Sequence, residues 1–295
     1  MADLPALLTP DPDFAELIAA RPALSAHPAD GLMLEEMPLA AIAAAAGTPS
    51  FVLSAGTLRD RYARLHAALA PLGVGIHYAV KANDHLAVLA LMADLGAGAD
   101  VVSGGELARA LHAGLPPARI VFSGVGKTRA EMAAAVAAGI GQINVESAEE
   151  LARLSAVAAG LGRTVPVALR VNPDVDAGTH AKITTGLAEN KFGIPAAEIP
   201  ALYARAAGLP GLRPIGLAVH IGSQIGRMGP YRAAFARLAA LVGALRAAGH
   251  EVTAVDCGGG LGISYRDEPE ASPEALAGAL RHAFAGHDLT LSVEP

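Results

Sequence analysis

The sequence of 295 residues has one cysteine, and only 17% of its residues are charged. The single Cys257 cannot form a disulfide within the chain. The net charge is −6 and no block of lysine or arginine occurs, so the basic surface typical of nucleic-acid-binding proteins is missing. Polar residues, glycine or proline interrupt every apolar run before the roughly 20 residues that a membrane-spanning helix needs. These absences argue against nucleic-acid and membrane partners and favour a small-molecule substrate.

The first residues also lack the features of a secretory leader. Residues 1–14 carry acidic residues and prolines where a basic segment and an apolar segment would stand. We therefore expect a cytoplasmic protein. With 53% hydrophobic residues, the chain has enough apolar surface for a sizeable core.

Short runs rich in valine and isoleucine alternate with longer segments of helical spacing, which predicts repeated β–loop–α units and a parallel sheet. We place the (β/α)8 TIM-type barrel in residues 48–295, behind a lead segment, residues 1–47, whose one predicted regular element is Pro38–Ala46. An open, doubly wound sheet is the alternative. The predicted strands are eight: His77–Lys81, Ala99–Ser103, Arg119–Ser123, Gln142–Glu146, Pro166–Val171, Pro214–His220, Glu251–Asp256 and Asp288–Val293.

Three predicted helices begin with a hydroxyl residue three positions before a glutamate, at Ser103, Thr128 and Ser147. This spacing is typical of the reciprocal capping box. The segment Ser123–Thr128 imitates the end of a phosphate-binding P-loop, but the first glycine of that motif would fall at a valine within a strand. We therefore interpret Thr128 as a helix cap and Lys127 as a surface or loop lysine.

Four residues that could carry chemistry end predicted strands. Lys81 ends an otherwise apolar strand, where a partly desolvated amine can form a Schiff base with an aldehyde; a snorkelling surface lysine is the alternative. His220, Arg170 and Glu294 end the sixth, fifth and eighth strands. Strand ends of a barrel face one mouth, so these side chains are expected to meet there. A buried carboxylate such as Glu294 then needs a cationic or N–H partner, whereas His220 alone could be a hydrogen-bonded core residue.

A glycine cluster follows the seventh strand. Backbone N–H groups of Gly258, Gly259 and Gly260 could approach a phosphate closely, and Ser223 could add a hydroxyl donor; a tight turn is the structural alternative. No pair of histidines has metal-ligand spacing with a third ligand nearby, so no metal site is predicted. Cys257 beside the cluster is interpreted as a small buried packing residue.

An amine, an imidazole, a carboxylate and a phosphate cradle at one mouth match the chemistry of pyridoxal 5′-phosphate. Lys81 would bind the aldehyde, His220 would lie against the ring, and Glu294 would face the pyridine nitrogen. The glycine cluster and Ser223 would hold the phosphate. The sequence therefore predicts a pyridoxal-phosphate site.

Several segments together resemble the fold-type III pyridoxal-phosphate-dependent decarboxylases, whose barrel is alanine racemase-like. The resemblance runs from about Gly31 to the last residue. Within this group, His180–Gly186, Lys191–Gly193 and Gln224 favour the diaminopimelate decarboxylases over the ornithine and arginine decarboxylases. The segments that carry the resemblance are Tyr78–Asn83, Gly98–Glu106, His220–Ile225, Asp256–Gly262 and Glu294–Pro295.

The resemblance implies loss of carbon dioxide from meso-diaminopimelate to give L-lysine, a reaction of lysine biosynthesis. It also implies that Arg170 lies near the cofactor and that a homodimer is expected. Members of the family continue after Glu-Pro with Gly-Arg, a last helix and a C-terminal β-domain that completes the site, and this sequence lacks them. The alternatives are a decarboxylase or racemase of another amino acid on the same scaffold, and a non-catalytic barrel that binds the cofactor.

Overall fold

The computed structural model describes residues 13–19, 21, 23–175, 192–264 and 271–295. The chain forms two compact units, Met1–Ala63 and Arg64–Pro295. The boundary between them along the sequence falls within helix α3 (Ala55–Leu69). The unit boundary differs from the predicted domain boundary after residue 47, which stays a prediction.

The first unit has more regular structure than the sequence indicated. Helix α2 (Leu39–Ala46) confirms the predicted element, but helix α1 (Phe14–Ala19) and an antiparallel three-stranded sheet were not predicted. The strands are short and none of their residues is buried, so no alternation of apolar and polar residues reveals them. They are β1 (Leu24–His27), β2 (Gly31–Leu34) and β3 (Met37–Pro38).

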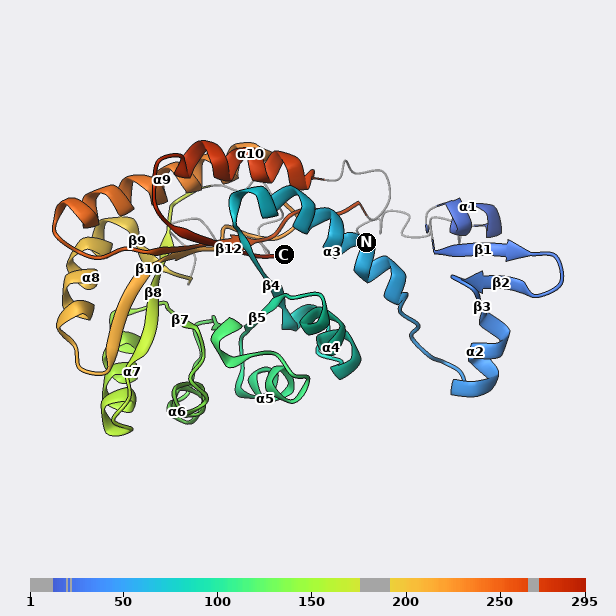
Figure 1. Ribbon diagram of the computed structural model, residues 1–295, viewed down its shortest axis with the longest axis horizontal. Helices are drawn as coiled ribbons and strands as arrows, with labels where there is room; N and C mark the ends of the chain where they lie inside the picture. Colours follow the sequence, from blue (N-terminus) through green and yellow to red (C-terminus); the bar gives the residue numbers. More distant parts are fainter. Residues whose placement is uncertain (1–12, 20, 22, 176–191, 265–270) are drawn as a thin grey trace, which may run out of the picture. The chain divides into compact units, whose positions relative to one another are not determined.

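Eight parallel strands of the second unit close into a barrel (Figure 1). The last strand pairs with the first, and β8 pairs with β10, so the sheet has no free edge between them. This closure confirms the (β/α)8 barrel and shows that the open-sheet alternative is wrong. The strands are β4 (Gly75–Ala79), β5 (Gly98–Val101), β6 (Ile120–Phe122), β7 (Gln142–Val145), β8 (Val165–Asn172), β10 (Leu212–Val219), β11 (Ala254–Gly259) and β12 (Thr290–Glu294).

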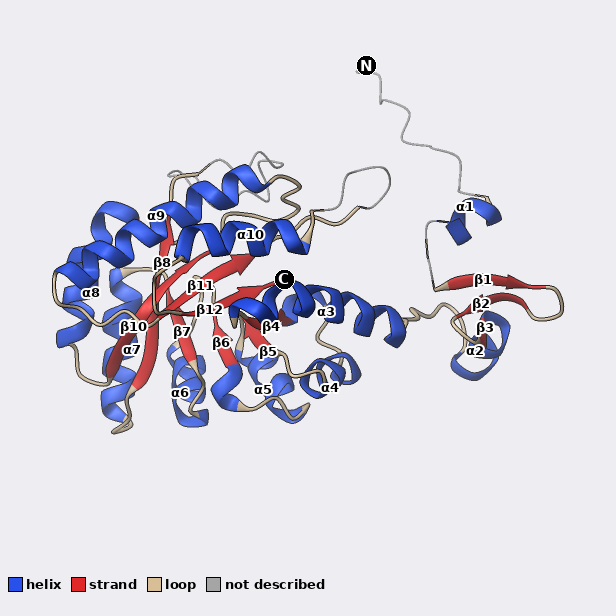
Figure 2. Cartoon of the chain, turned by 45° about the horizontal axis from the view of Figure 1, so that its top comes forward, coloured by secondary structure: helices blue, strands red, loops and turns tan. Residues whose placement is uncertain are grey.

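Helices surround the barrel, as Figure 2 shows. Every residue of β5 and β7 is buried, as expected for strands covered by side chains on one face and by helices on the other. The two-residue strand β9 (Ile194–Pro195) extends the sheet beside β8. The helices are α4 (Leu86–Asp94), α5 (Gly104–His112), α6 (Arg129–Ala138), α7 (Ala148–Gly160), α8 (Ile199–Gly208), α9 (Met228–Ala247) and α10 (Pro273–Phe284), with 3-10 turns η1 (Ala70–Leu72), η2 (Val80–Ala82), η3 (Pro117–Arg119) and η4 (Ala196–Glu198).

All three predicted hydroxyl caps form, but only one is a reciprocal box. Thr128 and its glutamate exchange both hydrogen bonds at the start of α6. The hydroxyls of Ser103 and Ser147 accept the expected N–H groups, whereas Glu106 and Glu150 accept from the residue before each cap. The prediction of three complete boxes is therefore wrong at α5 and α7, because a glutamate can reach past the cap residue.

Lys127 lies in the loop between β6 and α6, which confirms the loop interpretation, but it is buried, so the surface interpretation is wrong. Its side chain is 0% exposed and forms an ion pair of 2.7 Å with Glu150. The ammonium also donates to the carbonyl oxygens of Gly124 and Asn144, each at 2.7 Å. These three acceptors satisfy the three N–H donors of the lysine and join the β6–α6 loop to β7 and α7.

Replacing Lys127 by methionine is expected to lower the free energy of unfolding by about 3–5 kcal/mol, because it leaves a buried carboxylate and two carbonyls without their cation. Urea denaturation of the cofactor-free protein measures this change. Arg163→Met, which removes a cation from an exposed position, serves as the control and should stay within about 0.5 kcal/mol of the parent. Equal midpoints for the two variants would contradict the prediction.

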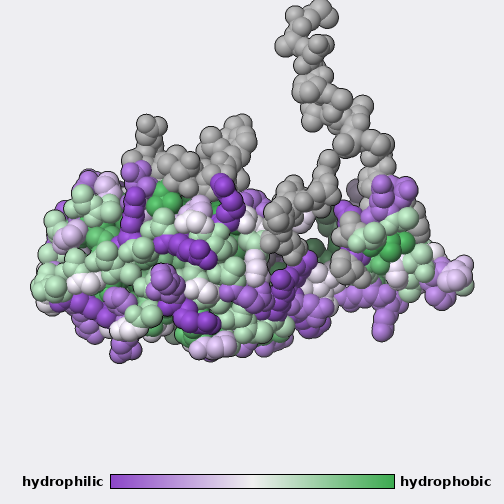
Figure 3. Space-filling model, turned by 90° about the horizontal axis from the view of Figure 1, so that it is seen from above, coloured by the Kyte–Doolittle hydropathy of each residue, from purple (hydrophilic) through white to green (hydrophobic). Residues whose placement is uncertain are grey.

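No helix in the part of the chain that the structure describes is long and apolar enough to cross a membrane. In the view of Figure 3, hydrophilic side chains are interspersed with hydrophobic ones over the barrel unit. The long helices α9 and α10 pack against one another on the barrel, and their buried residues form one face of each.

Candidate functional site

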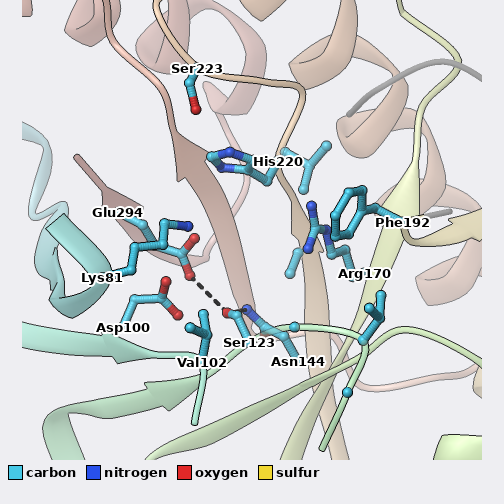
Figure 4. A pocket seen from close by; sticks show the side chains of 15 residues that line it. Lys81, Asp100, Val102, Ser123, Asn144, Arg170, Phe192, His220, Ser223 and Glu294 are labelled. Carbon is cyan, nitrogen blue, oxygen red and sulfur yellow. Dashed lines mark hydrogen bonds between the residues drawn. The ribbon is translucent and has the colours of Figure 1, made fainter. Parts of the chain in front are cut away.

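A cavity of about 460 Å³ opens among the carboxyl ends of the barrel strands. Figure 4 shows that five predicted site residues line it: Lys81, Arg170, His220, Ser223 and Glu294. They come from four different strands and the segments that follow them. The structure therefore brings together residues that lie up to about two hundred positions apart in the sequence, in a space of the size that holds a small ligand.

Lys81 lies two residues beyond the end of the strand that was predicted to include it. Strand β4 ends at Ala79, and Lys81 is the middle residue of the 3-10 turn η2. The turn directs its exposed side chain into the cavity, beside Glu294 and Asp100 (Figure 4). The amine is thus accessible to an aldehyde from the cavity, which the chemistry of Schiff-base formation requires.

Glu294 is the last residue of β12 and its carboxylate is buried. The hydroxyl of Ser123 donates to its Oε1 at 3.4 Å, and no lysine, arginine or histidine among the described residues forms an ion pair with it. Burial raises the pKa of Glu294 well above its usual range, and the nearby carboxylates of Asp100 and Asp256 raise it further. The site therefore presents a carboxyl group that gains strongly from a cationic partner.

His220 follows β10 and is neutral in this setting. Burial lowers the pKa of His220 to about 3, and the positive charges of Arg170 and Lys81 act in the same direction. The backbone N–H of Gly259 donates to its Nδ1 at 3.3 Å, which places the ring proton of the neutral imidazole on Nε2. A neutral, oriented ring can lie flat against an aromatic ligand.

Arg170 lies on β8 between an acidic and an aromatic partner. Its Nη1 donates to Glu146 Oε1 at 2.7 Å, and its guanidinium lies 5.1 Å from the centre of the Phe192 ring. Both side chains of the ion pair are buried. The guanidinium is thereby fixed at the wall of the cavity, where its other N–H donors can face an anionic group.

The glycine cluster does not line this cavity. Gly258, Gly259 and Gly260 lie where β10, β11 and β12 come closest, and a Cβ on any of them would overlap a backbone carbonyl oxygen of a neighbouring segment. Close packing thus explains why these residues are glycines, and their contact with a phosphate stays a prediction. Cys257 is buried beside them, which confirms its interpretation as a packing residue.

The sequence analysis missed an inner layer of polar residues, of which Asp100, Ser123 and Asn144 line the cavity. Asn144 Nδ2 donates to Ser123 Oγ at 3.1 Å and to Asp256 Oδ2 at 2.8 Å, and Gln142 donates to the Asn144 amide oxygen at 2.7 Å. Asp100 lies in the same layer with its Oδ1 unpartnered among the described residues. A polar residue inside an apolar strand was the available signal, as in Gly98–Val101 and Gln142–Val145.

Asp100 gives the cofactor-free protein a testable pH dependence. Asp100 is 1% exposed, and burial raises the pKa of its carboxyl group from 3.8 to about 7. The folded state therefore binds a proton more tightly than the unfolded state, so the stability that this residue contributes is lost as the pH rises from 3.8 through about 7.

Asp100→Asn should remove that loss. Between these pH values, the melting temperature of the variant should fall by a few degrees less than that of the parent. The size follows because about 1 kcal/mol of stability shifts the melting temperature by roughly 2–4 °C in larger domains. Thermal unfolding of both cofactor-free proteins across the pH range measures the difference. Parallel curves would show that Asp100 is ionised throughout.

Two predicted segments lie outside the described residues. His180–Gly186 and Lys191, which favoured one group of decarboxylases, fall in residues 176–191. The neighbouring Phe192 is described and lines the cavity. Of the stretch between β8 and β9, the described residue Phe192 thus borders the cavity.

The residues present fit pyridoxal phosphate by the chemistry of their donor set. An accessible amine, a neutral imidazole, a guanidinium and a hydroxyl share one cavity with a buried carboxyl group. That carboxyl group, Glu294, has a raised pKa and forms no ion pair among the described residues, so a protonated pyridine nitrogen would supply a cationic partner. The site can therefore hold the cofactor with residues that the chain itself provides.

Comparison with known proteins agrees with this geometry. The pyridoxal binding domain of the pyridoxal-dependent decarboxylases matches residues 55–295. Diaminopimelate decarboxylase of Pseudomonas aeruginosa is 50% identical over 264 residues and that of Zymomonas mobilis 48% over 269 residues, each covering 90% of this chain. The chain spans 64% of the length of both relatives. A crystal structure of diaminopimelate decarboxylase from Helicobacter pylori complexed with L-lysine superposes with a TM-score of 0.85 and 37% identity, over 87% of this chain and 65% of that one.

Proposed function

The chain belongs to the family of pyridoxal-dependent decarboxylases through their pyridoxal binding domain, and from this premise we propose that it decarboxylates meso-diaminopimelate to L-lysine and carbon dioxide. The observation that carries the proposal is the meeting of Lys81, His220, Arg170 and Glu294 in one cavity. The substrate is supported by the names of relatives that are 48–50% identical and by the L-lysine bound to the Helicobacter pylori protein.

The residues of this chain have separate tasks in the proposed reaction. When bound, pyridoxal phosphate supplies an electron sink for the electron pair that remains when the bond between Cα and the carboxylate breaks and carbon dioxide leaves. Lys81 is the residue that would hold the cofactor, because its amine faces the cavity and can bind an aldehyde. Glu294 holds a proton at the pyridine nitrogen, which favours the uptake of electrons by the ring.

The remaining cavity residues position the cofactor. His220, neutral and held by the N–H of Gly259, would lie against the ring and keep water from that face. Arg170 offers a fixed cation to an anionic oxygen of the cofactor or substrate, and Ser223 offers a hydroxyl to the phosphate. We propose residues 48–295 as the cofactor-binding domain and residues 1–47 as its lead segment, and a homodimer as the assembly.

One observation favours a second candidate function. The chain spans 64% of the length of two relatives, so about a third of each relative has no counterpart in the part that matches. A barrel with the cofactor residues alone could bind pyridoxal phosphate without turning over an amino acid. This alternative shares the cofactor chemistry of the site and differs only in catalysis.

Release of carbon dioxide from meso-diaminopimelate, measured with added pyridoxal phosphate, tests the proposal. Ornithine, arginine and D-lysine serve as competing substrates in parallel assays. Preferential turnover of diaminopimelate supports the proposal, and preferential turnover of another amino acid contradicts the substrate. Binding of the cofactor with no turnover of any of them would support the non-catalytic alternative.

A further inference from the structure

A buried carboxylate behind the cavity wall connects three segments of the site. Glu146 directly follows β7 and is 5% exposed. Its two carboxylate oxygens accept three hydrogen bonds. Oε1 accepts from Arg170 Nη1 at 2.7 Å and from the backbone N–H of Gly124 at 2.9 Å. Oε2 accepts from the N–H of Gly193 at 3.3 Å. One carboxylate thus joins β8, the β6–α6 loop and the start of β9.

Each of the three partners belongs to the cavity or borders it. Arg170 and Gly124 line the cavity, and Gly193 follows Phe192, which also lines it. The Phe192 ring covers the guanidinium of Arg170, as Figure 4 shows, and Asn172 Nδ2 donates to the Phe192 carbonyl at 3.3 Å. Glu146 therefore holds both the cation and the backbone next to the ring that covers it.

The backbone at Gly193 allows this arrangement. Its φ is 76°, and a Cβ there would lie 2.9 Å from the backbone nitrogen of Asn172 and 3.2 Å from the carbonyl oxygen of Arg170. A residue with a side chain would be strained by its φ and would be pushed away from β8. The close approach brings the Gly193 N–H within reach of Glu146.

We propose that Glu146 is a positioning residue for the cofactor site: it fixes Arg170 toward an anionic oxygen of bound pyridoxal phosphate and holds the Gly124 loop against the same ligand. This inference rests on the proposed function, because it assumes that the cavity binds this cofactor. An arginine with a preset orientation loses less conformational freedom when it binds an anion, which increases affinity. Without its carboxylate, the buried guanidinium would be unpaired and free to turn from the cavity.

A neighbouring glutamate supplies a matched control. Glu150 is also 5% exposed, but its carboxylate binds Lys127 at 2.7 Å and the backbone N–H of Glu146 at 3.1 Å. Its side chain does not contact Arg170 among the interactions of the described residues. The two glutamates share burial and chemistry and differ in whether they orient the cavity arginine.

The experiment compares Glu146→Gln, Glu150→Gln, Arg170→Gln and the double variant Glu146→Gln/Arg170→Gln. Affinity for pyridoxal phosphate is measured by absorbance titration of each cofactor-free protein. Visible circular dichroism of the bound cofactor reports its orientation, and thermal unfolding reports the fold. We expect Glu146→Gln to weaken cofactor affinity by about tenfold or more and to reduce the dichroic band, while Glu150→Gln lowers the melting temperature and leaves both cofactor signals near those of the parent.

The double variant decides whether Glu146 acts through Arg170. If it does, adding Glu146→Gln to Arg170→Gln costs little further affinity. Unchanged affinity in Glu146→Gln, equal losses in Glu150→Gln, or fully additive losses in the double variant would overturn the inference. Should Glu146→Gln unfold, Glu146→Asp keeps the charge but is too short to reach Arg170, and the same loss is expected from it. If the parent protein itself does not bind the cofactor, the proposed function fails instead.

Discussion

Lys81→Ala is expected to abolish covalent attachment of pyridoxal phosphate and to lower decarboxylation on the order of 10³-fold or more. The side chain of Lys81 projects from the turn η2 into the cavity and is the amine that the cavity offers to an aldehyde. An alanine leaves the fold of the turn intact because the lysine side chain is exposed. The loss should therefore appear in cofactor attachment and activity and leave the melting temperature of the cofactor-free protein unchanged.

Reduction with borohydride identifies the lysine that carries the cofactor. The sequence has four lysines, Lys81, Lys127, Lys182 and Lys191, so peptide mass spectrometry can distinguish all of them. Lys81→Arg is the matched variant, because it keeps the positive charge but cannot form the imine. Label on Lys81 in the parent and none in either variant is the expected outcome. Label on a different lysine, or a visible cofactor band that persists in Lys81→Ala, would refute the assignment.

Glu294→Gln is expected to retain the attached cofactor and to lower the rate of decarboxylation by about 10²–10³-fold, the loss typical of removing a preorganised charge-stabilising group. A glutamine has the shape of the glutamate but cannot balance a protonated pyridine nitrogen. The ring would then accept the electron pair of the broken bond less readily. The visible spectrum checks cofactor attachment, and the rate of carbon dioxide release checks the reaction.

The same substitution should not harm the fold. Burial and the neighbouring carboxylates raise the pKa of Glu294 well above its usual range, which favours the neutral form of the side chain that glutamine imitates. Its contribution to stability is lost as the pH rises through that raised pKa, so the variant should gain relative stability at high pH. Glu149→Gln, at an exposed position of α7, is the control for activity. A loss in both variants, or a full rate in Glu294→Gln, would contradict the role of Glu294.

The barrel itself was largely predictable from local patterns. All eight predicted strands overlap the observed ones, because a strand buried on both faces is a short apolar run between helical segments. Differences are confined to strand ends, such as the turn that carries Lys81, and to the first unit, whose strands are too short for a periodic signal. The site residues at the strand ends were also predictable, because the carboxyl ends of all barrel strands face one mouth.

The partners of those residues were not predictable. Ser123 and Glu294 are 171 positions apart, and no local pattern joins a hydroxyl on one strand to a carboxylate on the last. The burial of Lys127 was not predicted, because its acceptors come from a loop, a strand and a helix that meet only when the barrel closes. The pairing of Arg170 with Glu146 was missed for the same reason.

The sequence by itself therefore determined the order of the barrel elements, the hydroxyl helix caps and the chemical inventory of the site, since these depend on residue types and spacings along the chain. Only the tertiary structure decided which charges are buried, which pairs neutralise one another and which side chains share the cavity. Closure of the sheet is the physical reason: it brings distant strands to hydrogen-bonding distance and removes water from the groups between them. Those two effects set the raised pKa values of Asp100 and Glu294 and the lowered pKa of His220.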